Sequence, residues 1–136
     1  MELSVAQARA RCASARVARL ATVDATARPH LVPVTFALHE DTLAIAVDHK
    51  PKRTTDLKRL RNIAANEAVS VLVDHYEEDW DRLWWVRADG TARVVPIGEP
   101  ALGRLVAKYP HYADRPPGGP LILVAVTTWR GWAASR

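Results

Sequence analysis

Short apolar segments, most of them alternating between apolar and polar residues, recur along this chain and are separated by polar or proline-containing turns. Successive side chains of an extended chain point to opposite faces, so this alternation predicts strands with one buried face. Valine and threonine are frequent in these segments and favour strands, because their branched side chains pack well on a pleated surface. The predicted strands are Val17–Asp24, His30–Leu38, Thr42–Val47, Ala68–Val73, Leu83–Ile97 and Pro120–Trp129.

Three other segments have a helical pattern. Residues 5–15 are rich in alanine and arginine and follow Ser4, a favourable N-cap residue. Thr55–Ala65 and Pro100–Lys108 carry apolar residues at helical spacing. About six antiparallel strands with peripheral helices predict a mainly β (α+β) fold, a small β-barrel. The length of 136 residues fits one domain, residues 1–136.

The dipeptide Asp89-Gly90 interrupts the longest predicted strand, Leu83–Ile97. Asp-Gly is favourable in a two-residue hairpin turn, and a glycine is also common at a β-bulge. The sequence therefore leaves two structures open here, a hairpin or a single bent strand.

The composition argues against several classes of protein. Hydrophobic residues make up 49% of the chain and charged residues 25%, which is ordinary for a folded protein. No apolar run approaches the roughly 20 residues of a membrane-spanning helix, and the first 15 residues lack a hydrophobic signal core. Cys12 is the single cysteine, which excludes an internal disulfide, and the five histidines lack zinc-ligand spacing. We expect a cytoplasmic protein without a metal or a membrane partner.

The segment Lys50–Asp56 combines three cations and two hydroxyls at the point where a predicted strand gives way to a predicted helix. Helix N-termini attract anions through unpaired N–H groups and the helix dipole. Lysine, arginine and threonine add donors worth about 1.5–3 kcal/mol each when a phosphate accepts them. The segment predicts a phosphate site, with His49 adjoining it. A solvated basic loop with a threonine cap is the alternative.

Nucleic acid is a weaker prediction, although the net charge is +4. Single-strand binders interleave cations with aromatic residues. Here the cations of residues 50–61 and the aromatics of residues 80–85 lie in separate segments, and the aromatic segment is acidic. We therefore predict no nucleic-acid partner.

Trp80, Trp84 and Trp85 form the aromatic segment, preceded by Tyr76 and an acidic turn. Because neighbours on a strand face opposite ways, only one residue of the pair Trp84 and Trp85 can point into the core. The other is left for a subunit interface or a ligand. Trp80 and one of the pair, for which we take Trp84, are candidate groove residues that stack on a planar ring. Core filling with an aromatic dimer seam is the alternative.

Taken together, three features resemble the pyridoxamine 5′-phosphate oxidase-like split β-barrel superfamily. They are Val17–Val23 as a first strand, Arg28-Pro-His-Leu-Val-Pro-Val-Thr-Phe-Ala as a second, and the basic turn before the helix with Asp56-Leu57 and Leu60. Within it, Asp79-Trp-Asp-Arg-Leu-Trp-Trp-Val-Arg resembles a subgroup of the actinobacterial proteins that use the deazaflavin coenzyme F420. The resemblance covers about Val17 to Trp129 and depends on the order and spacing of these pieces.

This resemblance implies a homodimer that binds a flavin or deazaflavin in a groove between two barrels. It implies that the phosphate binds Lys50, Lys52, Arg53 and Thr54. It also implies that the second strand lies beside the cofactor ring, which involves Val32, Pro33, Val34 and Thr35. Relatives often carry asparagine where this chain has the shorter Thr35.

The implied activity is that of an F420-dependent oxidoreductase, an F420H2-dependent reductase acting on a small electron-poor organic substrate. In such enzymes the cofactor carries the hydride and the protein supplies binding and orientation, so no catalytic residue is assigned. An FMN-binding oxidase or flavoprotein of the same fold is the alternative, with haem a weaker one. A non-catalytic coenzyme-binding protein and a nucleic-acid-binding barrel are the non-enzymatic alternatives. No GxSxG, GxGxxG or Walker A motif is present.

Overall fold

The computed structural model of this chain describes residues 1–47 and 57–135. The predicted cofactor residues His49, Lys50, Lys52, Arg53 and Thr54 lie outside the described residues. The helices and strands, in chain order, are α1 (Val5–Ser14), β1 (Ala18–Val23), β2 (Pro29–Val34), β3 (Phe36–His39), β4 (Thr42–Ala46), α2 (Lys58–Ala65), β5 (Ala68–His75), the 3₁₀ turn η1 (Trp80–Arg82), β6 (Trp84–Val95), α3 (Ala101–Lys108), the 3₁₀ turn η2 (Pro110–Ala113) and β7 (Leu121–Ala133).

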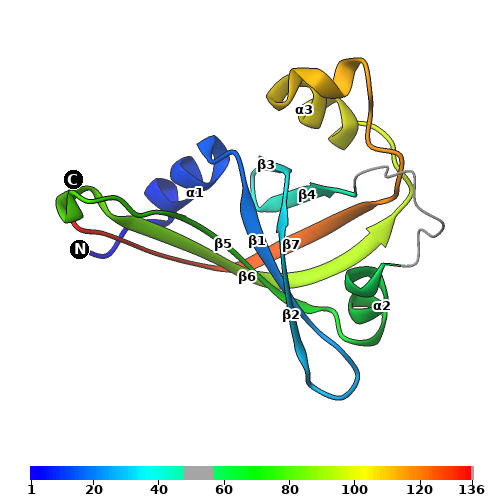
Figure 1. Cartoon of the computed structure of the whole chain (residues 1–136), viewed down its shortest axis with the longest axis horizontal. Coiled ribbons are helices and arrows are strands. Elements are labelled where there is room, and N and C mark those ends of the chain that lie inside the picture. Colours follow the sequence, from blue (N-terminus) through cyan, green and yellow to red (C-terminus); the bar gives the residue numbers. More distant parts are fainter. Residues whose placement is uncertain (48–56, 136) are drawn as a thin grey trace.

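One antiparallel sheet contains all seven described strands, in the order β2-β1-β5-β6-β7-β4-β3 (Figure 1). The strands at its two edges, β2 and β3, are consecutive in the chain and are separated only by Thr35. The two edges therefore meet at this residue, which requires the sheet to curl into a half-open barrel. Curling of this kind protects the edges, which otherwise expose unpaired backbone groups. The predicted mainly β architecture is confirmed.

The division at Thr35 also explains why the described residues form seven strands where the sequence predicts about six. The sequence predicts His30–Leu38 as one strand, because its apolar pattern continues through the bend. In the structure, β2 pairs with β1, whereas β3 pairs with β4. The sequence predicts a single strand that pairs with a neighbour on each side. In the structure the two pairings lie at opposite edges of the sheet, which is possible because the strand breaks at Thr35.

Of the two structures left open at Asp89-Gly90, the bent strand is the one observed. Strand β6 continues through both residues, and its register against β7 shifts between them, which marks a β-bulge. A Cβ atom placed on Gly90 would lie 2.1 Å from the carbonyl oxygen of Ala125. This close approach of two backbones requires glycine at the position.

The described helices are short: α1 and α2 cover the main core, and α3 packs on the other face of the sheet. Helix α1 begins with a capping box in which the Ser4 side chain accepts from the Gln7 backbone and the Gln7 side chain accepts from the Ser4 backbone, as the N-cap prediction expects. Helix α2 begins at Lys58, and its N-cap residue, Leu57, supplies no side-chain acceptor. Among the described residues, no helix has the length and apolar character that crossing a membrane requires.

The main core fills the inside of the curled sheet and is covered by α1 and α2. Its largest fully buried side chains include Phe36, Leu20 and Ile45. One polar contact lies within it: Asn62 of α2 donates to the hydroxyl of Thr22 on β1 at 3.0 Å, and both residues are buried. Because a buried polar group without a partner is costly, this bond fixes how α2 sits against β1.

A second, smaller core lies on the outer face of the sheet beneath α3. Leu105 of α3, Tyr109 and Tyr112 pack there on Ala37, Ala46 and Leu121. Strands β3 and β4 are therefore buried on both faces, which explains the continuous burial of residues 43–47. This packing holds α3 and η2 next to the bend at Thr35.

Candidate functional site

The bend between β2 and β3 contains the four residues predicted to lie beside a cofactor ring. Val34 is buried in the main core, and Val32 packs against the same core. Pro33 is exposed on the opposite face, and Thr35 is half-buried. The Thr35 carbonyl accepts from the Ala46 amide at 3.1 Å, which ties the bend to the end of β4. The bend therefore offers Pro33 and Thr35 to a ligand, whereas Val32 and Val34 help to fix its backbone.

Two buried tyrosines hold this bend from outside the barrel. The Tyr109 hydroxyl donates to the Arg16 carbonyl at 2.9 Å and accepts from the Phe36 amide at 3.2 Å. The Tyr112 hydroxyl and the Thr35 hydroxyl are hydrogen-bonded at 2.7 Å. Burial raises the pKa of Tyr109, so the group stays a protonated donor at neutral pH. Sequence reasoning missed both tyrosines, because it placed them in a loop; the only signal was two tyrosines flanking a short turn.

The loop that follows η2 returns to the end of β4. The Gly119 amide donates to the Val47 carbonyl at 3.2 Å. A Cβ atom on Gly119 would lie 2.9 Å from a Val47 methyl group, closer than ordinary packing allows. Val47 is the last described residue before the predicted phosphate segment, and this loop packs against it.

Helix α2 follows the predicted phosphate segment and is strongly cationic at its start. Lys58, Arg59 and Arg61 lie within its first turn, and residues 57–65 contain no carboxylate. Lys58 pairs with Asp24 at 3.4 Å. The backbone N–H of Arg28 and the Thr26 hydroxyl hold the pKa of Asp24 well below its usual range. Asp24 thus remains charged at neutral pH and connects α2 to the β1–β2 turn.

The tryptophans divide between the two faces of β6 and the adjoining turn. Trp84 points inward, packs against the main core, and has the Arg11 guanidinium 5.2 Å from its ring centre. Trp85 points to the outer face, where it is directly opposite Trp132 of β7. Trp80 of η1 is 74% exposed. Core packing explains the inward position of Trp84, and a contact between Trp84 and a cofactor stays a prediction. The exposed Trp80 is accessible to a ligand.

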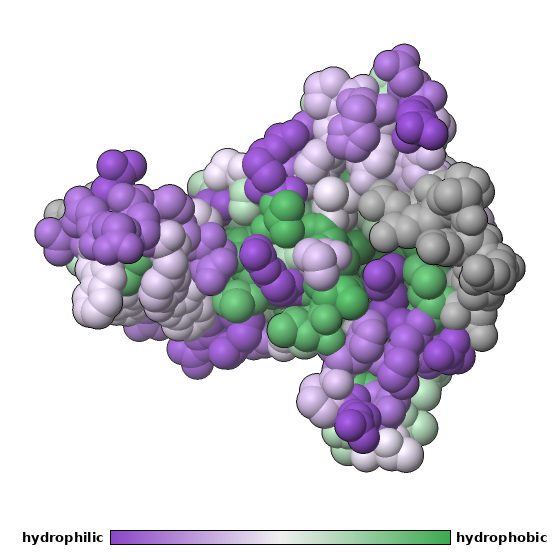
Figure 2. All heavy atoms as spheres, viewed as in Figure 1, coloured by the Kyte–Doolittle hydropathy of each residue, from purple (hydrophilic) through white to green (hydrophobic). Residues whose placement is uncertain are grey.

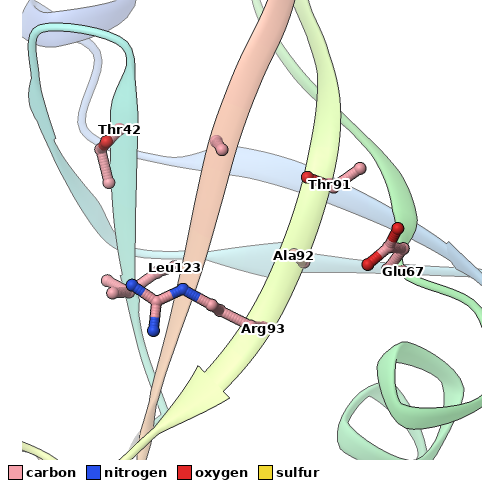
Figure 3. A pocket seen from close by; sticks show the side chains of 7 residues that line it. Thr42, Glu67, Thr91, Ala92, Arg93 and Leu123 are labelled. Atoms are coloured by element: carbon pink, nitrogen blue, oxygen red, sulfur yellow. The ribbon is translucent and has the colours of Figure 1, made fainter.

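A shallow pocket of about 170 Å³ lies on the outer face of β4, β6 and β7, beside the second core. Figure 3 shows the Arg93 side chain extending across β7 toward Leu123, with Glu67 on the other side of β6. Its remaining lining residues are Thr42, Thr91, Ala92 and Ala125. No predicted site residue contributes to it. Strand alternation turns Thr91 and Arg93 of β6 outward, on either side of Ala92, which belongs to the main core. The convergence of the pocket residues depends on the register of three strands.

The bend, the start of α2 and the exposed Trp80 are suited to binding a ligand. In residues 1–47 and 57–135, no three His, Cys, Asp or Glu side chains are grouped so that they would hold a metal ion. What the described part offers is a rigid bend with small side chains, a cationic helix start and an exposed tryptophan. Such an arrangement suits binding and orienting a ligand that carries its own reactivity.

Comparison with known proteins adds a family and a relative. Residues 4–133 match the family model described as pyridoxamine 5′-phosphate oxidase. Over 97 residues the chain is 35% identical to the 5a,11a-dehydrotetracycline/5a,11a-dehydrooxytetracycline reductase of Streptomyces rimosus. This match covers 71% of the chain but only 63% of that protein.

Solved structures share the fold at low sequence identity. A conserved hypothetical protein of Mycobacterium tuberculosis superimposes with a TM-score of 0.78 at 18% identity, over 97% of this chain and 86% of that one. A FAD-binding protein of Mesorhizobium loti superimposes with a TM-score of 0.72 at 21% identity, over 96% and 95%. Together with the family match over nearly the whole sequence, these results show that the chain belongs to the pyridoxamine 5′-phosphate oxidase family.

Proposed function

We propose that this protein is an F420-dependent oxidoreductase, a reductase that uses F420H2 to reduce a small electron-poor organic substrate. The observation that carries the proposal is the 35% identity to a protein named as a reductase of dehydrotetracyclines, within a family of oxidases. Dehydrotetracyclines are conjugated carbonyl compounds, which accept a hydride readily. A shared fold alone does not specify activity, so the site residues have to support the choice.

In this proposal, the cofactor supplies the hydride chemistry and the chain binds and orients it. Lys50, Lys52, Arg53 and Thr54, with His49 adjoining, bind the phosphate. Val32, Pro33, Val34 and Thr35 lie beside the ring, and Trp80 and Trp84 line the groove. The hydrogen bonds of Tyr109 and Tyr112 to the bend support this assignment. They hold the backbone of the bend in place, and a fixed backbone is what orients a bound ring.

We also propose that the protein is a homodimer. The outer face of β2, β1 and β5 presents Leu31, which is 67% exposed, and Leu72. One row of this face contains Leu31, Ala21 and Ser70, and the neighbouring row contains Pro33, the exposed Arg19 and Leu72. Figure 2 shows hydrophobic side chains gathered over the middle of the molecule on this view. A second copy is the occupant that this face suits, since an isologous contact places the same apolar patch on both sides of a two-fold axis.

FMN is the alternative cofactor, in an FMN-binding oxidase or flavoprotein. The observation that favours it is the fold shared with a protein named as FAD-binding, which superimposes over nearly its whole length. FMN and F420 both present an anionic phosphate to the basic segment. The protein can therefore distinguish them only by contacts to the ring system.

A spectral titration with F420 and FMN, side by side, tests the proposed function. We expect saturable binding of F420, tighter than that of FMN. Replacing Lys50 and Lys52 together with alanine should weaken F420 binding at least about tenfold for each lysine, since each charge-assisted bond contributes about 1.5–3 kcal/mol. The matched control, Lys50→Arg with Lys52→Arg, retains both cations and should bind within a few-fold of the wild type. Tight FMN binding without F420 binding would favour the flavoprotein, and binding of neither cofactor would overturn both.

A further inference from the structure

The side chains of Pro33 and Thr35 lie on the outer side of the bend between β2 and β3. Val34 and Phe36, the residues that alternate with them, are buried in the main core. Successive side chains of an extended chain point to opposite faces, so Pro33 and Thr35 face away from that core. Pro33 is exposed and Thr35 is half-buried. The outer side of the bend is therefore the side from which a ligand reaches these two residues.

The second core holds Tyr112 against this same side of the bend. Tyr112 is 4% exposed and packs with Leu105 and Tyr109 on the outer face of the sheet. The η2 turn that contains it follows α3, which lies over β3 and β4 (Figure 1). The Tyr112 hydroxyl is hydrogen-bonded to the Thr35 hydroxyl at 2.7 Å. Because a closely packed ring has little freedom to move, its hydroxyl is a fixed point for the Thr35 side chain.

The bond to Tyr112 leaves part of the hydrogen-bonding capacity of Thr35 unused. A threonine hydroxyl has one donor and two acceptor positions, and within the described part of the chain it bonds to Tyr112. The backbone around it is fixed as well. The Thr35 carbonyl accepts from the Ala46 amide at 3.1 Å, and the Phe36 amide donates to the Tyr109 hydroxyl at 3.2 Å. With both the backbone and the hydroxyl held, the remaining positions of the hydroxyl point in a set direction.

We infer that Tyr112 is a positioning residue: it holds the Thr35 hydroxyl in the orientation in which this hydroxyl bonds to a polar atom at the edge of the cofactor ring. This inference rests on the proposed function, which places Thr35 beside that ring. Rings of the flavin and deazaflavin type carry carbonyl oxygens and an N–H group at their edge, so they fit a hydroxyl that both donates and accepts. A hydroxyl that is oriented before binding loses less entropy when the ring binds, which strengthens binding without any contact from Tyr112 itself.

A double-mutant cycle of cofactor binding tests this inference. Thr35→Val removes the hydroxyl and should weaken F420 binding about 2- to 12-fold, the range for one neutral hydrogen bond. Tyr112→Phe retains the aromatic ring and should weaken binding about threefold, because the Thr35 hydroxyl regains three staggered positions. In the Thr35→Val background, Tyr112→Phe should change the affinity no further. The visible absorption band of bound F420 is a second readout, and both single variants should shift it relative to the wild type.

Two controls separate positioning from a loss of stability. Val106→Ala truncates a side chain that packs against the second core and keeps both hydroxyls, so it should bind F420 with the affinity and the absorption band of the wild type. Thr35→Ser keeps the hydroxyl, so Tyr112→Phe should still weaken binding in that background. Urea unfolding identifies conditions in which every variant is folded. If Tyr112→Phe does not fold, Tyr112→Leu, which also lacks the hydroxyl, takes its place in the cycle.

Each other outcome overturns the inference. Equal losses from Tyr112→Phe with and without the Thr35 hydroxyl would show that Tyr112 acts only through the fold. A Tyr112→Phe variant with the affinity and absorption band of the wild type would show that Tyr112 does not orient the hydroxyl. If Thr35→Val binds F420 like the wild type, Thr35 does not contact the ring, although the proposed cofactor stands.

Failure of the proposed function gives a different result, which is seen before any substitution is made. A wild type that binds neither F420 nor FMN refutes the proposed function and the inference with it. If the wild type binds FMN alone, the same cycle is measured with FMN, and the same losses are expected.

Discussion

The hydroxyl groups of Thr35 and Tyr112 are hydrogen-bonded at 2.7 Å, although 77 positions separate these residues in the chain. The bond joins the bend between the two edge strands to the η2 turn that follows α3. Tyr112 is buried and Thr35 is half-buried, so the bond is largely shielded from bulk water. The bend that the proposed function places beside the cofactor ring is therefore held by a segment from the far end of the sequence.

Removing either hydroxyl should destabilise the fold. We expect Thr35→Val and Tyr112→Phe each to lower the free energy of unfolding by about 0.5–1.5 kcal/mol, since each removes this hydrogen bond. The double variant should lose about 1 kcal/mol less than the sum of the single losses. Urea unfolding measures all three. Tyr76→Phe, at an exposed tyrosine, is the control and should change stability little; strictly additive losses would show that the bond contributes no coupling.

Replacing Gly90 with alanine should be among the most costly small changes in the protein. The added Cβ would lie 2.1 Å from the Ala125 carbonyl oxygen, so the backbones of β6 and β7 would have to separate. Overpacking against movable side chains costs about 1–3 kcal/mol, and we expect a loss at the top of that range or above it. Gly98→Ala is the control, because nothing lies within 4 Å of its added Cβ. Thermal or urea unfolding compares the two, and equal stabilities would contradict the observed bulge.

Asp41 should make stability depend on pH in the acidic range. Hydrogen bonds from the Trp129 indole at 2.9 Å and from Arg9 at 2.8 Å hold the pKa of Asp41 below its usual value. A folded-state pKa below the unfolded one means that the unfolded state binds the proton first as pH falls. The contribution is thus complete above about pH 5 and disappears as pH falls below about 4.

Asp41→Asn removes this titration and tests it. The variant should be less stable than the wild type at pH 6, and the difference should shrink steadily toward pH 3. Glu40→Gln changes the adjacent, exposed carboxylate and should leave the acidic profile close to that of the wild type. Urea unfolding at a series of pH values measures the difference, and a gap independent of pH would contradict the assignment.

Lys108 should make stability depend on pH in the alkaline range. Its ammonium group lies 3.7 Å from the centre of the Phe36 ring, and burial lowers its pKa to about 8, with the nearby Arg16 adding to the effect. Above pH 8 the folded state loses this proton while the unfolded state, with a pKa near 10.4, keeps it. The destabilisation by Lys108 is therefore complete below about pH 8 and is relieved as pH rises toward 10.

Lys108→Met keeps most of the packing and removes the charge. We expect the variant to be more stable than the wild type at pH 7, with the advantage narrowing by pH 9.5. Lys58→Met, at an exposed lysine that pairs with Asp24, is the control and should give no such gain. A variant that is less stable at pH 7 would show that the contact with the Phe36 ring outweighs the cost of burial.

Local signals predicted most of the secondary structure. Strands β1 and β5 follow from alternation, β4 follows from a short apolar run, and α1 follows from Ser4 and the helix-forming residues after it. These preferences depend only on near neighbours in the chain. The same reasoning predicted one strand across Thr35. The strand breaks there because the sheet closes on itself, and this closure involves strands that are distant in sequence. The local sequence pattern therefore does not indicate the break.

The candidate site was likewise predictable only in part from the sequence. Strand alternation shows that Trp84 and Trp85 face opposite sides, but only the register against Ala133 and Trp132 decides which side is the core. The tyrosines that hold the bend were missed because their partners, Arg16, Thr35 and Phe36, are more than 70 positions away. The basic segment at Lys50–Asp56 was recognised from its charge alone, and its contacts stay a prediction.

The amino-acid sequence by itself determined where the chain is extended or helical, where its charge is concentrated, and which family it resembles, because propensity, periodicity and charge are properties of short stretches. The tertiary structure alone decided that both edges of the sheet meet at Thr35 and that two tyrosines from beyond α3 hold that bend. These are relations between residues far apart in the chain, and they become fixed only when seven strands settle into one register around a shared core.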